Sequence, residues 1–392
     1  MFGLKDVRIA MSNNFRRRLE DLQGKMVDFG INLVVYGSCQ NFQYLTGLLI
    51  EWRRGTDLMH PQDNVFVPRQ GDPILTLAPA SSKQAEEAWI DDVRIMDKDD
   101  DFKDIAEKIA FDLGWDGGII GVGDHLWGST WVDLARAFKG AEFRSAKSLM
   151  DNVRMFKEPA EIAILRRVAR LTDKVMEEII SEVENGVTQN DLRINIEIAG
   201  RRMQATDISF PPTGGFVKAG SEVSNDPFIY PMDKGLVPGC SIAFDVGFVL
   251  NGYCSDWGRS VYWGTASTEV SEGYASLQQA VIETVDMMKS GSMKVCDIFP
   301  SIERVLDREG YGDYLRARLP HGSVGHQIGV EVHEPPWLKP ENDDLIKEGM
   351  VMCLEPKLWH AGEYYLRVED MVLIKQDSAE FLTNFDRELF QL

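Results

Sequence analysis

Five side chains of the types that bind metal ions follow one another in the second half of the sequence. They are Asp245, Asp256, His326, Glu355 and Glu369. Four carboxylates and one imidazole suit Mn²⁺, Co²⁺, Fe²⁺ or Zn²⁺, and the sequence does not choose among them. The pattern therefore indicates a metal-dependent hydrolase.

The two aspartates belong to a predicted β-hairpin over residues 240–263. Asn251-Gly252 is the favoured pair for a two-residue type I′ turn. The predicted cross-strand pairs are Leu250 with Tyr253, Gly247 with Asp256, and Asp245 with Gly258. This register puts Asp245 and Asp256 on one face as diagonal neighbours, roughly 7–8 Å apart. Two carboxylates at this distance repel each other unless a cation lies between them. This favours a metal site over an exposed polar face.

The histidine and the two glutamates lie in segments that are otherwise apolar or rich in glycine. His326 lies close to His321 and His333, and two prolines after His333 exclude the helix of a zincin motif. An odd-length turn centred on Gly362 would set Glu355 directly across from Glu369. A glutamate inside an apolar strand is costly unless it is paired or bound to metal.

Arg367 lies two residues before Glu369, so both side chains are expected on the same strand face. Its guanidinium could hold a ligand carboxylate through two parallel hydrogen bonds. A buried Arg–Glu pair with a purely structural role is the alternative.

The elements that must position these side chains indicate two domains, since 392 residues exceed one ordinary core. Residues 1–153 form an α/β domain. Its predicted strands are 31–36, 64–67, 74–77 and 118–122, and its predicted helices are 13–29, 81–90, 101–113 and 129–138. Residues 154–392 form the second domain, which holds nearly all the candidate chemistry. It opens with a long helix from Pro159 to Gly186, and Thr188 and Asp191 then cap another helix.

The composition excludes several classes of partner. A net charge of −20 repels nucleic acid and anionic membranes, so neither is expected. No stretch has the length of a transmembrane helix, and residues 1–14 lack the apolar segment of a secretory signal. The five cysteines are odd in number and form no CxxC pair. They indicate a reducing, cytoplasmic location and no thiolate zinc site.

Three motifs carry a resemblance to a known family. They are YLTGLL after the first predicted strand, FKEPAEIAILRRVARLTD at the domain boundary, and GHQIGVEVHEPPW with GMVMCLEP and LRVED near the end. This pattern resembles the pita-bread-fold metallopeptidases: Xaa-Pro aminopeptidase, prolidase and creatinase. The resemblance implies an α/β N-terminal domain, an α+β pita-bread catalytic domain, and a homodimer.

The resemblance also implies roles for individual residues. The five ligand positions would hold two metal ions, which about 3.5–4 Å apart could hold a bridging hydroxide and polarise a substrate carbonyl. Glu355 would also move a proton to the leaving nitrogen. His333 would contact the substrate carbonyl or the tetrahedral intermediate. Phe228 occupies a position where the family peptidases carry a histidine that binds the scissile amide.

The resemblance assigns a further substrate contact to the N-terminal domain. Trp52, Arg53 and Arg54 follow YLTG, in a loop that in relatives reaches the partner subunit's active site. One arginine is expected to bind a substrate carboxylate there. An exposed basic loop without such a role is the alternative.

Three functions are compatible with these residues. The first is a metallopeptidase that cleaves an Xaa-Pro or other small dipeptide. The second, which Phe228 favours, is a metalloenzyme of the same fold acting on a small amide, amidine or osmolyte-like compound by hydrolysis or elimination. The third is an inactive binding module, which the full set of ligands disfavours.

Overall fold

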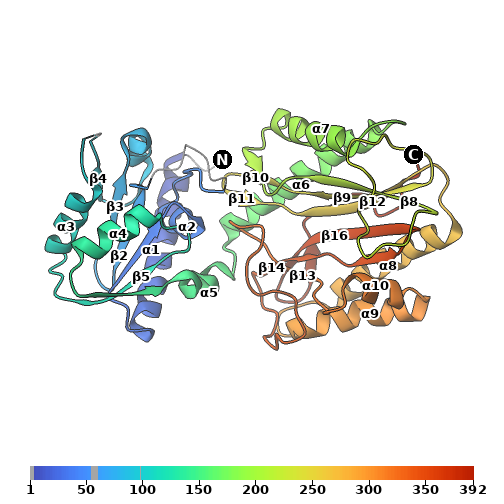
Figure 1. The fold of residues 1–392 in the computed structure, drawn as a ribbon. Coiled ribbons are helices and arrows are strands. Elements are labelled where there is room, and N and C mark those ends of the chain that lie inside the picture. Colours follow the sequence, from blue (N-terminus) through green and yellow to red (C-terminus); the bar gives the residue numbers. More distant parts are fainter. Residues whose placement is uncertain (1–3, 54–60, 98) are drawn as a thin grey trace. The chain divides into compact units, whose positions relative to one another are not determined.

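The computed structural model of the chain describes residues 4–53, 61–97 and 99–392. The chain forms two compact units, Met1–Arg154 and Met155–Leu392. Figure 1 shows the helices and strands of each unit. The sequence predicts a division after residue 153.

The first unit is a six-stranded mixed sheet with strand order β4-β3-β2-β1-β5-β6. Its elements are α1 (Leu4–Asp28), β1 (Leu33–Gly37), α2 (Gln40–Thr46), β2 (Asn64–Pro68), β3 (Ile74–Leu77), η1 (Pro79–Glu87), β4 (Asp92–Ile95), α3 (Phe102–Asp112), β5 (Gly118–Val122), α4 (Gly128–Ala137), β6 (Ala141–Ser145), η2 (Lys147–Met150) and α5 (Asp151–Arg154). Helices α3 and α4 pack together against the sheet.

Several elements of the first unit differ from the sequence prediction. The predicted helix over 81–90 is the 3₁₀ segment η1, and α1 begins well before residue 13. Strands β4 and β6 were not predicted because both lie at sheet edges with largely exposed, polar side chains. Helix α2 was missed because all of its side chains are buried, and a helix buried on every side shows no amphipathic pattern.

The second unit contains one large curved sheet with strand order β13-β14-β16-β12-β9-β8, and β15 and β17 pair with β16. Three short strands, β11-β10-β7, form a separate sheet. The elements are α6 (Pro159–Ser181), α7 (Gln189–Arg202), β7 (Asp207–Ile208), β8 (Thr213–Lys218), β9 (Cys240–Val246), β10 (Phe248–Leu250), β11 (Tyr253–Cys254), β12 (Trp257–Trp263), α8 (Thr268–Met287), η3 (Val295–Asp297), α9 (Ile298–Glu309), α10 (Gly312–Arg318), β13 (Gly325–Gln327), β14 (Val351–Leu354), β15 (Lys357–His360), β16 (Tyr364–Ile374) and β17 (Ala379–Phe381). In Figure 1 the strands lie between α6 and α7 above and α8, α9 and α10 below.

The large sheet is curved, and both groups of helices in the second unit, α6 with α7 and α8 with α9, pack on the same outer face of it. Phe244 of β9 is paired with Arg259 of β12, which is paired with Val368 of β16, and residues in register point to one face. Phe244 belongs to the core under α6 and α7, and Val368 to the core under α8 and α9. The opposite face is therefore left for the predicted ligands. We refer to it as the site face.

The predicted hairpin is present in the predicted register. Leu250 pairs with Tyr253, and Gly258 pairs with Asp245. Asn251 and Gly252 have φ angles of 49° and 81°, as a type I′ turn requires. The strands break near Gly247, so the tip joins the small sheet while β9 and β12 lie inside the large one. An exposed edge hairpin is thereby excluded.

The long helix α6 begins at Pro159 as predicted but ends at Ser181, before Gly186. The helix that follows starts with the predicted capping box. The hydroxyl of Thr188 accepts from the Asp191 N–H at 3.1 Å, and the Asp191 carboxylate accepts from the Thr188 N–H at 3.0 Å. Each contact satisfies a backbone donor at the helix end that would otherwise lack a partner.

Asp173 of α6 gives a testable dependence of stability on pH. The side chain is 6% exposed, and burial raises its pKa from 3.8 to about 6. One oxygen accepts from the Asn384 N–H at 2.7 Å, and the other has no hydrogen-bond partner within the described ranges of the chain. The folded state therefore binds more protons than the unfolded state between pH 4 and 6, and the free energy of unfolding falls as pH rises through that range.

We expect Asp173→Asn to raise the free energy of unfolding at pH 7.5 by roughly 1–3 kcal/mol, with little difference from wild type near pH 4. An asparagine oxygen can still accept from Asn384, but no charge is buried. Urea unfolding at both pH values measures the effect, with Asp286→Asn on the exposed side of α8 as control. A variant that is less stable than wild type at pH 7.5 contradicts the argument.

Candidate metal centre

The site face carries a row of acidic side chains across neighbouring strands. Asp245 of β9 pairs with Gly258 of β12, and Gly258 pairs with Glu369 of β16. The pairs Leu354–Asp370 and Lys357–Arg367 share one register, which sets Glu355 opposite Glu369 as predicted. A Cβ atom on Gly258 would lie 2.9 Å from the Glu369 Cβ and 2.6 Å from the Arg367 Cδ. The glycine therefore leaves space between the acids.

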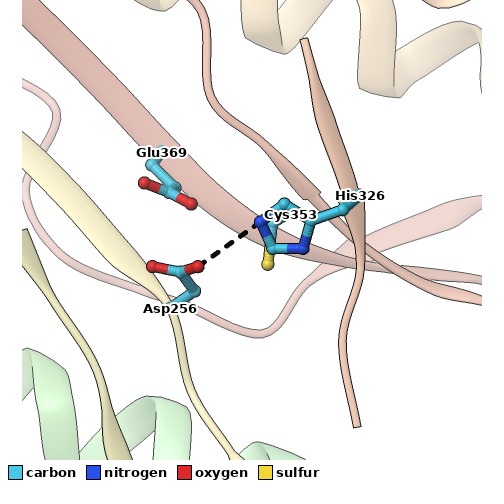
Figure 2. A group of neighbouring side chains, drawn as sticks. All are labelled: Asp256, His326, Cys353 and Glu369. Carbon is cyan, nitrogen blue, oxygen red and sulfur yellow. Dashed lines mark ion pairs between the residues drawn. The ribbon is translucent and has the colours of Figure 1, made fainter. Parts of the chain in front are cut away.

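Four buried side chains converge beside this row, as Figure 2 shows. Asp256, His326, Cys353 and Glu369 each offer one ligand atom, and these atoms all lie within 4.8 Å of one another. The His326 Nε2 is 3.5 Å from an Asp256 oxygen and 3.9 Å from a Glu355 oxygen. Three of the five predicted ligands thus meet in this four-residue cluster, with Glu355 at its edge.

The other two acids of the row are in contact with cations of the chain. The Asp245 carboxylate forms an ion pair with the Arg367 guanidinium, which is 3.8 Å from Glu369. Glu355 forms an ion pair with the Lys357 ammonium group. Asp245 is therefore the one predicted ligand that lies outside the four-residue cluster and away from His326 in the described contacts.

The electrostatics of the four-residue cluster fit a bound cation. Burial, and then the charge of Glu355, raises the pKa of Asp256; burial, and then Asp256, raises the pKa of Glu369. Asp256 Oδ1 and both Glu369 oxygens have no hydrogen-bond partner among the described residues. Buried carboxylates without partners are costly. A divalent ion would remove both the repulsion and the missing contacts, so these residues fit the metal that the sequence predicts.

The imidazole of His326 is oriented for coordination. Its Nδ1 lies 3.0 Å from the Gln327 carbonyl oxygen. A proton on Nδ1 would be donated to that oxygen and would leave the Nε2 lone pair facing Asp256, which is the usual arrangement of a metal-bound histidine.

Cys353 was not predicted as part of the site. It pairs across the strands with His326, and it lies two residues before Glu355 on the same face. Burial, followed by the charges of Asp256 and Glu369, raises the pKa of the Cys353 thiol. A protonated thiol is a poor ligand, so Cys353 lies among better donors in the four-residue cluster. Its spacing from Glu355 was the signal in the sequence.

His333 lies beside the four-residue cluster and is held by a buried ion pair. Its ring centroid is 4.4 Å from that of His326, and Trp337 lies 5.3 Å away on another side. The neighbouring Glu334 accepts from the Lys157 ammonium group at 3.0 Å, and both side chains are almost fully buried. Lys157 comes from the FKEP motif and was missed because this contact joins distant segments.

Phe228 covers the site face farther along the strands. Its side chain is 40% exposed, and its ring lies 4.9 Å from that of Tyr365. It can approach because Gly215 beneath it has no side chain: a Cβ there would lie 2.4 Å from the phenyl ring. Tyr365 is four residues before Glu369, roughly 13 Å along the strand. Contact between Phe228 and substrate stays a prediction.

Trp52 and Arg53 lie in the first unit. Trp52 is 6% exposed and its indole N–H donates to Gln43 at 3.0 Å, while the Arg53 guanidinium lies 4.4 Å from the indole ring centroid. Arg54 lies outside the described residues. The substrate contacts expected of this loop stay predictions.

A curved sheet with helices on one face and buried acids around a histidine on the other defines the pita-bread class of metal-dependent hydrolases. The model of metallopeptidase family M24 matches residues 163–376, and that of the creatinase/prolidase N-terminal domain matches residues 18–156. The chain therefore belongs to metallopeptidase family M24 and is a hydrolase. Both the family resemblance and the fold class predicted from the sequence are confirmed.

Individual relatives agree with this assignment. "Putative dipeptidase YkvY" of Bacillus subtilis (strain 168) is 30% identical over 259 residues, which cover 66% of this chain and 69% of the relative. A dipeptidase structure from Pyrococcus horikoshii OT3 aligns with a TM-score of 0.83 at 24% identity, covering 96% of this chain and 100% of the other. An Xaa-Pro dipeptidase from Bacillus anthracis aligns with the same score and identity, covering 97% and 100%. The two structural matches show a shared fold.

Among the residues that the structure describes, no helix has the length and apolar character needed to cross a bilayer.

Proposed function

We propose that the protein is a metal-dependent dipeptidase that hydrolyses the peptide bond of small substrates, including Xaa-Pro dipeptides. The observation that carries this proposal is the pair of buried carboxylates Asp256 and Glu369 beside His326. Asp256 Oδ1 and both Glu369 oxygens have no hydrogen-bond partner in the described part of the chain. The dipeptidase names of the relatives support the substrate class. They favour it over the non-peptide alternative, and family membership favours an enzyme over an inactive module.

The metal would be held by Asp256, His326 and Glu369, with Glu355 adjoining them. The sequence predicts a second ion, bound with the help of Asp245. Bound divalent ions would activate water as a nucleophile and polarise the scissile carbonyl group. The residues do not select among manganese, cobalt, iron and zinc.

Glu355 is our candidate for the group that moves the proton. Burial alone would raise its pKa, but Lys357 and His326 outweigh burial and lower it. The carboxylate is therefore ionised at neutral pH. It can accept a proton from the attacking water and pass it to the leaving nitrogen.

His333 is our candidate for stabilising the developing oxyanion. Partial burial, followed by the neighbouring His326, lowers the pKa of His333. The imidazole is therefore neutral at pH 7 and offers one N–H donor beside the four-residue cluster. Phe228 would place an apolar surface on the leaving-group side.

The assembly and location remain inferences from the sequence and family. We infer a homodimer in the cytoplasm. None of the five cysteines, all of which the structure describes, forms a disulfide, which is compatible with the reducing compartment that the sequence predicts.

Removal of metal tests the proposed function directly. After treatment with a chelator, the protein should hydrolyse Ala-Pro and other dipeptides at less than about 1% of its loaded rate, because Lewis-acid activation is lost. Added Mn²⁺ or Co²⁺ should restore the rate. Product amino acids are measured by chromatography, and Mg²⁺ serves as the control ion. Full activity without metal contradicts the proposal. Stoichiometric metal without cleavage of any dipeptide would instead support a non-peptide substrate.

A further inference from the structure

We propose that the Lys357 ammonium group takes the place of a second metal ion, so that each chain binds one divalent ion, in the four-residue cluster. This inference rests on the proposed metal-dependent function and changes its expected stoichiometry from two ions to one.

The contacts of the acidic row divide the predicted ligands into two groups. Asp245 and Glu355 are each ion-paired with a cation of the chain. Asp256 and Glu369, in contrast, have buried oxygens with no hydrogen-bond partner among the residues that the structure describes, and their ligand atoms converge with His326. Glu369 also lies 3.8 Å from the Arg367 guanidinium, but that guanidinium is in closer contact with Asp245. Asp256 and Glu369 are thus the two acids whose ligand atoms meet at one point. That arrangement describes one ion site rather than two.

Lys357 is placed in this site by the sheet itself. It is two residues after Glu355 and directly opposite Arg367, so both cations lie on the site face in the row next to the acids. Its side chain is 9% exposed, and Glu355 is the one carboxylate that its ammonium group contacts within 4 Å among the described residues. Separating the pair would leave a buried ammonium group without a partner, which is strongly unfavourable.

The charges of the row, taken together with Asp256 of the four-residue cluster, also balance with one ion. Asp245, Asp256, Glu355 and Glu369 carry four negative charges when ionised, and Arg367 and Lys357 compensate two of them. One divalent ion neutralises the remainder. A second divalent ion would give the same buried site an excess of positive charge. Uncompensated charge is more unfavourable in the low-dielectric interior of a protein than in water.

Metal stoichiometry tests this inference independently of activity. Each protein is loaded with excess Mn²⁺, desalted, and analysed for metal per chain by elemental mass spectrometry. We expect one ion in the wild type and two in Lys357→Met, in which the side chain keeps its length but loses its charge. The matched control is Lys375→Met, which removes an exposed lysine that pairs with Glu380 at 3.0 Å, and it should bind one ion.

Electron paramagnetic resonance of the same samples gives a second readout. The wild type should show the spectrum of an isolated Mn²⁺ ion, and Lys357→Met that of two coupled ions. Two ions in the wild type, or one in a folded Lys357→Met protein, overturns the inference while leaving the metal-dependent function intact. A wild type that binds none overturns the proposed function itself.

A variant that leaves Lys357 in place covers the case in which Lys357→Met does not fold. Asp245→Asn should still bind one ion, because Asp245 lies outside the four-residue cluster. A fall from two ions to one in Asp245→Asn contradicts the inference.

Discussion

Replacing Glu369 by glutamine should abolish metal binding and lower kcat/KM for dipeptides by about 10³-fold or more, a loss of roughly 4 kcal/mol or more in transition-state stabilisation. Glu369 is 1% exposed, and neither of its carboxylate oxygens has a hydrogen-bond partner among the side chains and backbone that the structure describes. An amide fits the same space but cannot supply the negative charge that a divalent ion requires. Elemental analysis and dipeptide hydrolysis measure the two effects.

The same variant should be more stable than the wild type when both are free of metal. Burial and the charge of Asp256 raise the pKa of Glu369, so its ionised form destabilises the folded state at neutral pH. Glutamine removes that charge. The control is Glu363→Gln, which changes an exposed glutamate in the turn before β16 and should alter neither property. If Glu369→Gln keeps its metal and activity, the four-residue cluster is not the catalytic centre.

Rules that involve only neighbouring residues were sufficient to predict much of the metal centre. The Asn251-Gly252 turn and the two-residue period of a strand determine the hairpin register, which puts Asp245 in line with Gly258. The same period sets Glu355 opposite Glu369 across the turn at Gly362. Such predictions succeed because turn type and alternation involve neighbouring residues and do not depend on the rest of the fold.

The partners of each acid could not be predicted in this way. The contact between Asp245 and Arg367 crosses from β9 to β16, two strands away in the sheet. Whether a carboxylate meets a guanidinium or a metal ion depends on that long-range packing. Lys357 is different, because its position two residues after Glu355 placed it on the site face in the sequence itself. The predicted ligand set did not include it, because an ammonium group has no free lone pair to offer a metal ion.

The contacts that hold the segment around His333 in place also depend on tertiary structure. Lys157 and Glu334 are far apart in sequence, and their buried pair forms only when the segment before α6 packs beneath the loop of His333. The spacing of apolar residues along the sequence does not indicate such a contact. The edge strands β4 and β6 were missed for a different reason, since an exposed strand needs few apolar residues.

Replacing His333 by alanine should lower kcat by about 100-fold, close to 3 kcal/mol, while the protein keeps its metal. The ring is next to His326 but outside the four-residue cluster, and its neutral imidazole offers a donor to the oxyanion. Because that contact strengthens only in the transition state, KM should change little. Steady-state kinetics with Ala-Pro and metal analysis separate the two properties.

Two further variants distinguish donation of a hydrogen bond from simple packing at His333. His333→Gln retains an N–H donor and should recover part of the lost kcat, whereas a packing role would predict no advantage over alanine. His321→Ala, an exposed histidine in the same segment, should leave kcat unchanged. Loss of metal in His333→Ala would mean that this residue belongs to the metal shell. A normal kcat would remove it from the mechanism, and oxyanion stabilisation would then have to come from another group on the site face.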